Sequence, residues 1–407
     1  MRTGNGKRGA RLARVTESSA ATTLELFFDL VFVFALTQVT AFMAEEPTPK
    51  GLLRGALVLA VVWWCWVAYS WSSNLVKADE GPARTALLGA MGAMFLIALA
   101  IPEAFEDLPG GLDGPLVFAL CYLLLRVIHL VLFWTASDND TGLRAQVVRF
   151  SASVVVGTSL LVVASQTEGW TQIAFWAAAV VADYGGNYLI GASGWRLPSA
   201  KHFAERHGLI VIIALGESIV AIGVGVNHLP ISWPIVAGAV LGLAIAASLW
   251  WAYFDTNVLI MEHALAEAGG AERTKLARSA FTYLHLPIII GVVMLALGLK
   301  KTLGYLGGHD GHSPSDHLHG APLWALFGGA ALYLLAMAAI SHRCGHGHKP
   351  QRLALGVLLL AITPLMGLVP AFVALIVLSA ALIGLNAGEW VHYRDQRHEI
   401  RHATAGH

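Results

Sequence analysis

The chain has 407 residues, of which 56% are hydrophobic and only 13% are charged. Soluble globular domains carry about 25% charged residues, so this composition excludes an ordinary soluble protein and indicates a membrane protein whose main partner is the lipid bilayer. The formal net charge is zero, and the sequence contains no nucleic-acid-binding motif, so we expect no nucleic-acid partner.

Twelve apolar segments are long enough to cross a bilayer. The hydrocarbon core is about 30 Å thick, and a helix rises about 1.5 Å per residue. We therefore predict an all-α fold, a polytopic helical membrane protein with about 12 transmembrane helices. In chain order, the expected spans are residues 24–43, 52–73, 84–102, 115–135, 146–165, 170–190, 206–226, 233–254, 279–299, 322–341, 352–369 and 370–386.

Basic residues are distributed unevenly between the two sides of the predicted bundle. With the N-terminus placed in the cytoplasm, most of the 26 Lys and Arg residues fall in the inner loops and tails. Cytoplasmic loops of membrane proteins are enriched in Lys and Arg, so we expect both termini to be cytoplasmic. The outer loops hold only Lys50, Arg54, Lys300 and Lys301, and Arg126 lies within the fourth span.

The two halves of the sequence match one another at positions that occur in the same order. Residues 66–69 (WVAY) match residues 250–253 (WWAY), and Arg84 matches Arg278 at the start of the third span of each half. Shared hydrophobicity alone aligns any two membrane segments to some degree, but these Trp, Tyr and Arg matches are not generic. The pattern favours an internal duplication.

The duplication predicts two six-helix halves, residues 1–196 and residues 197–407. Six spans are an even number, so the halves have the same orientation and are related by an axis along the membrane normal. Cytoplasmic tails are expected at residues 1–20 and 388–407.

Polar side chains within the apolar spans are the candidate functional residues. Glu25 and Asp29 stand four residues apart in the first span and share one helix face. A charge near the bilayer centre costs about 2.5–3.5 kcal/mol, so such residues usually face a protein interior or a water-filled path. Structural ion pairs are the alternative. The predicted polar path consists of Glu25, Asp29, Gln38, Arg206, His207 and Glu217.

A second group of intramembrane polar residues is predicted around Arg126, which cannot lose its charge and needs a partner. His129 lies one turn further along the same span, and Asp183 in the sixth span is the most plausible acidic partner. Asp255 and His285 complete this group. Asp255 stands at the end of span eight, where it can reach cytoplasmic water, and His285 before Pro287 is a candidate proton-linked residue, with a hydrogen-bonded packing role as the alternative.

Two loops are rich in histidine, and dense neutral imidazoles can bind zinc, nickel or copper. Flexible His-rich tracts also occur without a dedicated site, so there are two interpretations, a metal-binding site and a tract that binds no metal. No other cofactor is predicted. The candidate ligands are His309, His312, His317 and His319 in one loop and His342, His346 and His348 in the other.

Three segments resemble the bacterial low-temperature-requirement A (LtrA) family. They are TLELFFDLVFVFALTQV (residues 23–39), ERHGLIVIIALGESIVAIG (205–223) and LWWAYFDTN (249–257), and the resemblance extends over about residues 20–390. It implies a polytopic protein of the bacterial cytoplasmic membrane. The family name describes a growth phenotype and specifies no mechanism.

A weaker similarity is to the six-span subunits of the lysosomal potassium and proton channel family. Those channels carry an Arg…Phe-Ser-Asp motif in their first span, whereas here Phe28 directly precedes Asp29. The second half has Gly208 where the first half has Asp29. This difference argues against a symmetric potassium filter.

The leading hypothesis is a cation- or proton-linked transporter or channel with a polar path between the two halves. Asp29 and Glu217 would bind the cation or relay protons, while Arg206 and Glu25 would gate the inner end. The alternatives are an intramembrane enzyme acting on a lipid or isoprenoid, and a membrane sensor or assembly protein whose buried charges are all paired. The transported solute or ion is unknown, and a homo-oligomer is compatible with the sequence.

Overall fold

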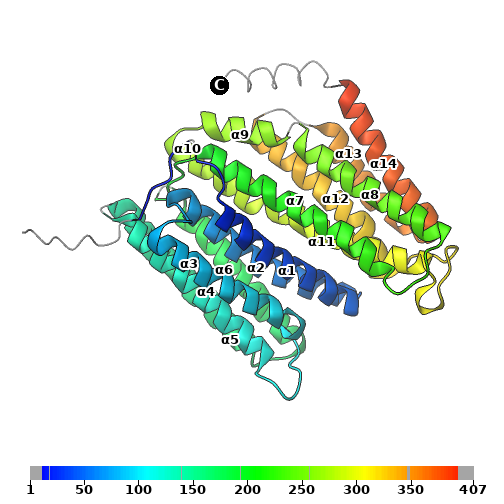
Figure 1. The fold of residues 1–407 in the computed structure, drawn as a ribbon, viewed down its shortest axis with the longest axis horizontal. Coiled ribbons are helices and arrows are strands. Elements are labelled where there is room, and N and C mark those ends of the chain that lie inside the picture. The colour runs from blue at the N-terminus through cyan, green and yellow to red at the C-terminus, as the bar shows by residue number, and fades with distance from the viewer. Residues whose placement is uncertain are drawn as a thin grey trace, which may run out of the picture. The chain divides into compact units, whose positions relative to one another are not determined.

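The computed structural model describes residues 12–17, 19–138, 140–192, 194–255, 257–345 and 349–392. This described part is helical and contains no β-strand. Its helices are α1 (Thr23–Glu45), α2 (Pro49–Leu75), α3 (Gly81–Ala100), η1 (Ile101–Glu103), α4 (Gly114–Ser137), α5 (Thr141–Ala164), α6 (Gly169–Ile190), α7 (Ala200–Gly225), α8 (Trp233–Phe254), α9 (Asn257–Glu267), α10 (Gly270–Leu276), η2 (Ala277–Tyr283), α11 (His285–Leu306), η3 (His309–Gly311), α12 (Gly320–Arg343), α13 (Pro350–Met366) and α14 (Ala371–His392) (Figure 1).

Eleven helical stretches of the described residues are long and apolar enough to cross a membrane. They confirm the predicted all-α membrane fold. The expected span at residues 352–369 corresponds to α13, which has 17 residues and is shorter than the other eleven. At 1.5 Å per residue its length is about 26 Å, less than the ~30 Å hydrocarbon core.

The segment between the eighth and ninth expected spans is helical instead of an extended loop. It forms α9, α10 and the π-helix η2. The α9 sequence NVLIMEHALAE is rich in Leu, Ala and Glu, which favour helix, and the helix ends before Gly269 and Gly270. A hydrophobic pattern alone had placed the helix start later, at residue 279.

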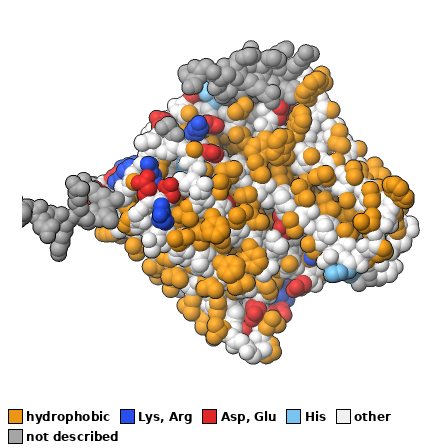
Figure 2. Space-filling view, viewed as in Figure 1, with side chains coloured by type: hydrophobic (Ala, Val, Ile, Leu, Met, Phe, Trp, Pro, Cys, Tyr) orange, Lys and Arg blue, Asp and Glu red, His pale blue; other side chains and the backbone are white. Residues whose placement is uncertain are grey.

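The outward-facing side chains of the spans are largely apolar. Hydrophobic side chains cover much of the face that Figure 2 shows. Val155 in α5, Val181 in α6 and Val240 in α8 each expose more than half of their surface, at 63%, 68% and 62%. Soluble monomers rarely expose contiguous apolar patches of this kind, because water disfavours them. A bilayer is the solvent that such a surface requires.

Several spans begin with proline or with a capping aspartate. Proline occupies the first turn of α3, α4, α8 and α13, where its missing N–H removes no helical hydrogen bond. Asp113 and Asp140 precede α4 and α5, and each accepts a 2.9 Å hydrogen bond from a backbone N–H of the first turn. These residues fix where the helices start.

The described residues divide into two compact units. Unit 1 falls within Met1–Ala35 and Val61–Arg206, and unit 2 within Leu36–Ala60 and His207–His407. Helices α1, α2 and α7 therefore contribute residues to both units. The sequence duplication, with its boundary after residue 196, remains a prediction.

Within unit 2, α11 and α12 pack closely because glycines face one another. A Cβ atom at Gly329 would lie 2.6 Å from the carbonyl oxygen of Gly291, and one at Gly298 would meet the backbone of Leu326 at 2.5 Å. Small residues of this kind let membrane helices approach to backbone contact. Gly384 in α14 differs, because a Cβ there would have no neighbour within 4 Å.

We predict that Gly329→Ala lowers the stability of the protein, whereas Gly384→Ala does not. Gly329→Ala overpacks the α11–α12 contact and is expected to lower the free energy of unfolding by about 1–3 kcal/mol. Gly384→Ala fills open space within a helix and is expected to leave it unchanged or raise it by up to about 1 kcal/mol. Unfolding by sodium dodecyl sulfate in mixed micelles measures both, and equal stabilities would contradict this packing.

Candidate functional site

Unit 1 contains a buried ion cluster made of Glu25, Asp29, Trp66, His202 and Arg206. The Arg206 guanidinium binds both acids, with Nη1 2.8 Å from Glu25 Oε1 and Nη2 2.7 Å from Asp29 Oδ1. All three side chains are at most 1% exposed. The structure thus brings together the two acids and the arginine that the sequence predicted as partners.

The geometry of the ion cluster follows from helix periodicity. Glu25 and Asp29 are one turn apart in α1, so one guanidinium from α7 reaches both carboxylates. The planar fork of arginine suits such a shared contact better than a lysine ammonium would. The indole ring of Trp66 lies against Arg206, with the guanidinium carbon 5.6 Å from the ring centroid.

Further donors bind the two acids of the ion cluster, among them the backbone N–H of Thr22, which lies 2.7 Å from Glu25 Oε2. Trp66 donates its indole N–H to Asp29 Oδ1 at 2.7 Å, and His202 Nε2 lies 3.0 Å from Glu25 Oε1. Asn74 Nδ2, which can only donate, lies 3.2 Å from His202 Nδ1. His202 therefore accepts at Nδ1 and donates from Nε2 to Glu25.

The ion cluster contains more acids than cations. Two carboxyl groups share one guanidinium, and His202, as a neutral donor, adds no charge. Asp29 Oδ2 is buried and has no hydrogen-bond partner among the described residues. A buried charge without compensation is costly, so the cluster is chemically suited to hold one additional proton or cation at Asp29.

A second polar group in unit 1 is the arginine cage around Arg126, which is fully buried. Its guanidinium carbon lies 4.9, 5.8 and 5.9 Å from the ring centroids of Phe150, Tyr122 and Trp64. Its Nη2 lies 3.8 Å from Asp183 Oδ1, and Tyr122 donates its hydroxyl to Asp183 Oδ2. The predicted partnership of Arg126 with Asp183 thus exists as an ion pair, supported by cation–π contacts.

His129 belongs to the arginine cage as a packing residue. It is 2% exposed, and its ring lies 4.9 Å from that of Phe133 and 5.8 Å from that of Tyr69, centroid to centroid. Gly157 in α5 provides space for Asp183, because a Cβ there would approach the carboxylate to 2.9 Å. The cage therefore depends on a glycine that the sequence pattern did not single out.

Unit 2 contains a buried carboxyl group at Glu217 in α7. This side chain is 2% exposed and accepts a 2.7 Å hydrogen bond from Thr37 Oγ1 of α1. Among the described residues it forms no ion pair. Gln38, a member of the predicted polar path, is half-buried, and its neighbour Thr37 makes the contact with Glu217.

A histidine group lies in another part of unit 2. His285 is fully buried, with Nδ1 2.9 Å from the carbonyl oxygen of Ala280 and Nε2 2.8 Å from the Tyr253 hydroxyl. A carbonyl only accepts, so Nδ1 carries the proton and Nε2 accepts from Tyr253. His207 stacks edge-on against His285 and Phe281, each at a centroid distance of 5.1 Å.

His285 directly follows the π-helix η2 (Ala277–Tyr283). A π-helical turn displaces the backbone pattern of an α-helix and occurs frequently at functional sites. Here it places the carbonyl of Ala280 at the imidazole. Asp255 lies at the C-terminal end of α8 and is half-buried.

The predicted metal ligands are not gathered into a site by the described residues. His312 stacks on Tyr305 and lies 3.4 Å from Asp316, while His317 and His319 lie 5.7 Å apart, ring to ring. No group of three or more His, Cys, Asp or Glu side chains in the described ranges is arranged to hold a metal ion. His309 and His342 are described, whereas His346 and His348 lie outside the described residues.

Sequence reasoning missed His202, Tyr122 and Thr37 as partners of the buried acids. Each is a polar residue within or beside an apolar span, which is the one signal available in the sequence. Their pairing depends on how the helices are rotated about their axes, and hydropathy does not fix that rotation. Trp66 belongs to the matched segment 66–69, but the match does not predict its hydrogen bond to Asp29.

The sequence of the chain matches a known protein family. A family model described as bacterial low temperature requirement A protein (LtrA) matches residues 20–387. The chain is also 29% identical, over 303 residues, to the uncharacterized protein RA0937 of Rhizobium meliloti (strain 1021), which covers 71% of each chain. No solved structure matches the chain.

We predict that Arg206→Met destabilises the protein by about 3–5 kcal/mol, because it leaves buried carboxylates without their cation. Adding Glu25→Gln and Asp29→Asn to this variant removes the charges and is expected to restore part of the loss. Arg84→Met, at an exposed arginine, is the matched control and should have little effect. Thermal unfolding in detergent measures all three, and a triple variant no more stable than Arg206→Met would contradict the assignment.

Proposed function

The chain belongs to the bacterial low temperature requirement A family and is a multi-pass membrane protein, and from this premise we propose that it is a transporter or channel that moves protons or a cation. The predicted family resemblance is thereby confirmed. We place the protein in the bacterial cytoplasmic membrane, with both termini inside, because of the distribution of Lys and Arg along the sequence.

The observation that carries the proposal is the environment of Glu217. Its carboxyl group is buried within a membrane-spanning helix, accepts a hydrogen bond from Thr37, and forms no ion pair among the described residues. A carboxyl group in such surroundings either holds a proton or binds a cation, since an isolated buried charge is strongly disfavoured. A carboxyl group that holds a proton or binds a cation within the membrane could serve as the binding site of a proton or cation carrier.

The ion cluster of unit 1 supports the same function with a second acid. Asp29 keeps one carboxylate oxygen without a hydrogen-bond partner, while Arg206 and Trp66 occupy the other. We infer that Asp29 accepts the transported charge and that Arg206, paired with Glu25, opens or closes access to it. Occupation of Asp29 by a proton or cation would weaken its bond to Arg206, which provides the physical basis for gating.

The environment of Glu217 favours transport over the two alternatives. A sensor or assembly protein would have its buried charges paired, whereas Glu217 forms no salt bridge in the described part of the chain, and the charge of Lys300 acts on it only from a longer distance. The alternative of an intramembrane enzyme acting on a lipid or isoprenoid gains no support from the groove between α8 and α14, because no acidic or basic residue lines that groove.

We predict that Asp29→Asn and Glu217→Gln each reduce ion flux by more than about tenfold, which corresponds to about 1.4 kcal/mol in the barrier. The substitutions keep the shape of each side chain and remove its charge and exchangeable proton. Flux is measured in proteoliposomes loaded with a pH-sensitive dye, under imposed gradients of H⁺, Na⁺ or K⁺. Circular dichroism and thermal unfolding check that the variants are folded.

Glu272→Gln is the matched control, because Glu272 is an exposed acid bound to Lys275 at the surface. Its flux should equal that of the unchanged protein. Thr37→Val, which removes the hydroxyl donor to Glu217, should alter flux less than Glu217→Gln does. Flux of H⁺, Na⁺ and K⁺ no greater than in empty liposomes, or unchanged flux in both acid variants, would contradict the proposal.

A further inference from the structure

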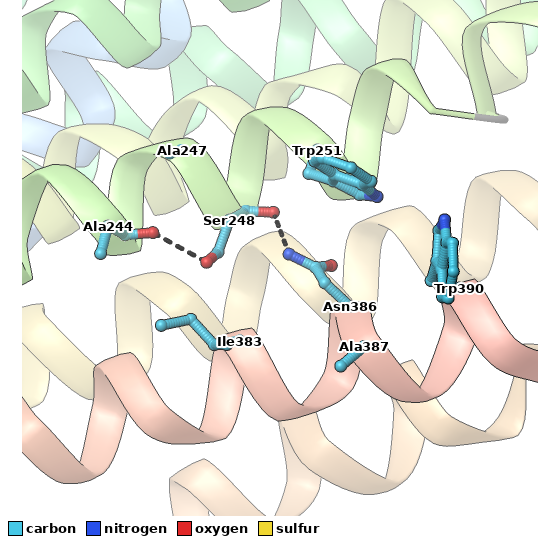
Figure 3. A pocket seen from close by; sticks show the side chains of 8 residues that line it. All are labelled: Ala244, Ala247, Ser248, Trp251, Ile383, Asn386, Ala387 and Trp390. Carbon is cyan, nitrogen blue, oxygen red and sulfur yellow. Dashed lines mark hydrogen bonds between the residues drawn. The ribbon is translucent and has the colours of Figure 1, made fainter.

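A groove with a volume of about 480 Å³ lies between α8 and α14 in unit 2 (Figure 3). This volume falls within the ~300–1,000 Å³ typical of sites for small organic ligands. Both helices are candidate membrane spans. The lining residues are Ala244, Ala247, Ser248 and Trp251 of α8 and Ile383, Asn386, Ala387 and Trp390 of α14.

Small side chains create the groove, and one polar contact holds its two walls together. Asn386 Nδ2 donates a 2.9 Å hydrogen bond to the backbone oxygen of Ser248, which joins α14 to α8. Ser248 Oγ donates to the carbonyl of Ala244, so its hydroxyl is already satisfied. The alanines on either side leave the space that larger apolar residues would fill.

The groove has a polar end and an apolar body. Trp251 and Trp390 stand at one end and are 43% and 53% exposed. Beside them, Asn386 Oδ1 is buried and has no hydrogen-bond partner among the described residues. The remaining wall consists of Ile383 and alanines, apart from Ser248.

This distribution matches a membrane amphiphile. Trp side chains gather where the hydrocarbon core meets the headgroups, because the ring is apolar and the indole N–H is a donor. The pair lies near the C-terminal ends of both helices, Trp251 in α8 and Trp390 in α14. An acyl chain fits the apolar body, and the unpaired Asn386 oxygen requires a hydrogen-bond donor from the ligand.

We propose that the groove between α8 and α14 binds one acyl chain of a membrane glycerophospholipid, with the ester region at Trp251 and Trp390 and a headgroup donor at Asn386 Oδ1. The donor is a hydroxyl, as in phosphatidylglycerol, or an ammonium, as in phosphatidylethanolamine. Phosphatidylcholine has the same acyl and ester chemistry but no such donor. The one hydroxyl that lines the groove, Ser248 Oγ, donates to the carbonyl of Ala244, and no titratable side chain lies beside it to activate it, so we treat the bound lipid as a ligand and not a substrate.

Lipid binding to the full-length protein, delipidated in detergent, tests the proposal. Native mass spectrometry counts bound lipid, and thermal unfolding measures the stabilisation by phosphatidylglycerol, phosphatidylethanolamine or phosphatidylcholine. One or both of the first two should bind about tenfold more tightly than phosphatidylcholine. Asn386→Leu removes the acceptor oxygen and should abolish this preference.

Ala247→Phe fills the groove and should weaken binding of the preferred lipid by about tenfold or more. Val240→Phe is the matched control, since Val240 is 62% exposed on the same helix and does not line the groove. Trp251→Ala and Trp390→Ala, at exposed side chains, repeat the test if the filled variant does not fold.

Three outcomes would overturn the proposal. The first is equal binding of all three lipids to the unchanged protein. The second is equal loss of lipid in Ala247→Phe and Val240→Phe, which would mean unspecific coating of the apolar surface. The third is a change of oligomeric mass in Ala247→Phe with lipid binding unchanged, which would identify the groove as a contact between two copies of this chain.

Discussion

The cost of placing charge in a bilayer is the constraint on which the rest of this structure depends. One guanidinium, that of Arg206, offsets this cost by binding the carboxyl groups of both Glu25 and Asp29. The charge of Arg126 is stabilised by Asp183 and by three aromatic rings. The ion cluster contains more acids than cations, and Glu217 forms no salt bridge in the described part of the chain. These two features are the basis for the proposed transport mechanism.

The chain contains two kinds of candidate site. The buried acids lie inside the compact units, whereas the groove between α8 and α14 is open at its exposed tryptophans. The first kind of site handles a charge, and the second suits an amphiphile with a hydrogen-bond donor. A lipid held at α8 and α14 would also protect the short contact of Asn386 with Ser248, which joins two spans of unit 2.

Hydropathy and charge were sufficient to predict the helical membrane fold and the main buried acids, because a charge within an apolar segment is visible in any sequence. They also predicted Arg126 with Asp183. They did not predict that His202 binds Glu25 or that Thr37 binds Glu217, since these contacts depend on helix rotation.

The sequence did not predict the groove between α8 and α14, because small residues occur both where helices pack closely and where they leave open space. The length of α13 and the helices α9 and α10 depended on local propensity that a 20-residue window averages out.

The central claim is that the carboxyl group of Glu217 holds an exchangeable proton or binds a cation within the membrane. Infrared difference spectroscopy of the protein in lipid, with and without added Na⁺ or K⁺ and across a pH titration, measures this directly. We predict a carboxyl band that changes with pH or with the cation and that disappears in Glu217→Gln. A spectrum in which Glu217→Gln removes no responsive band would contradict the account.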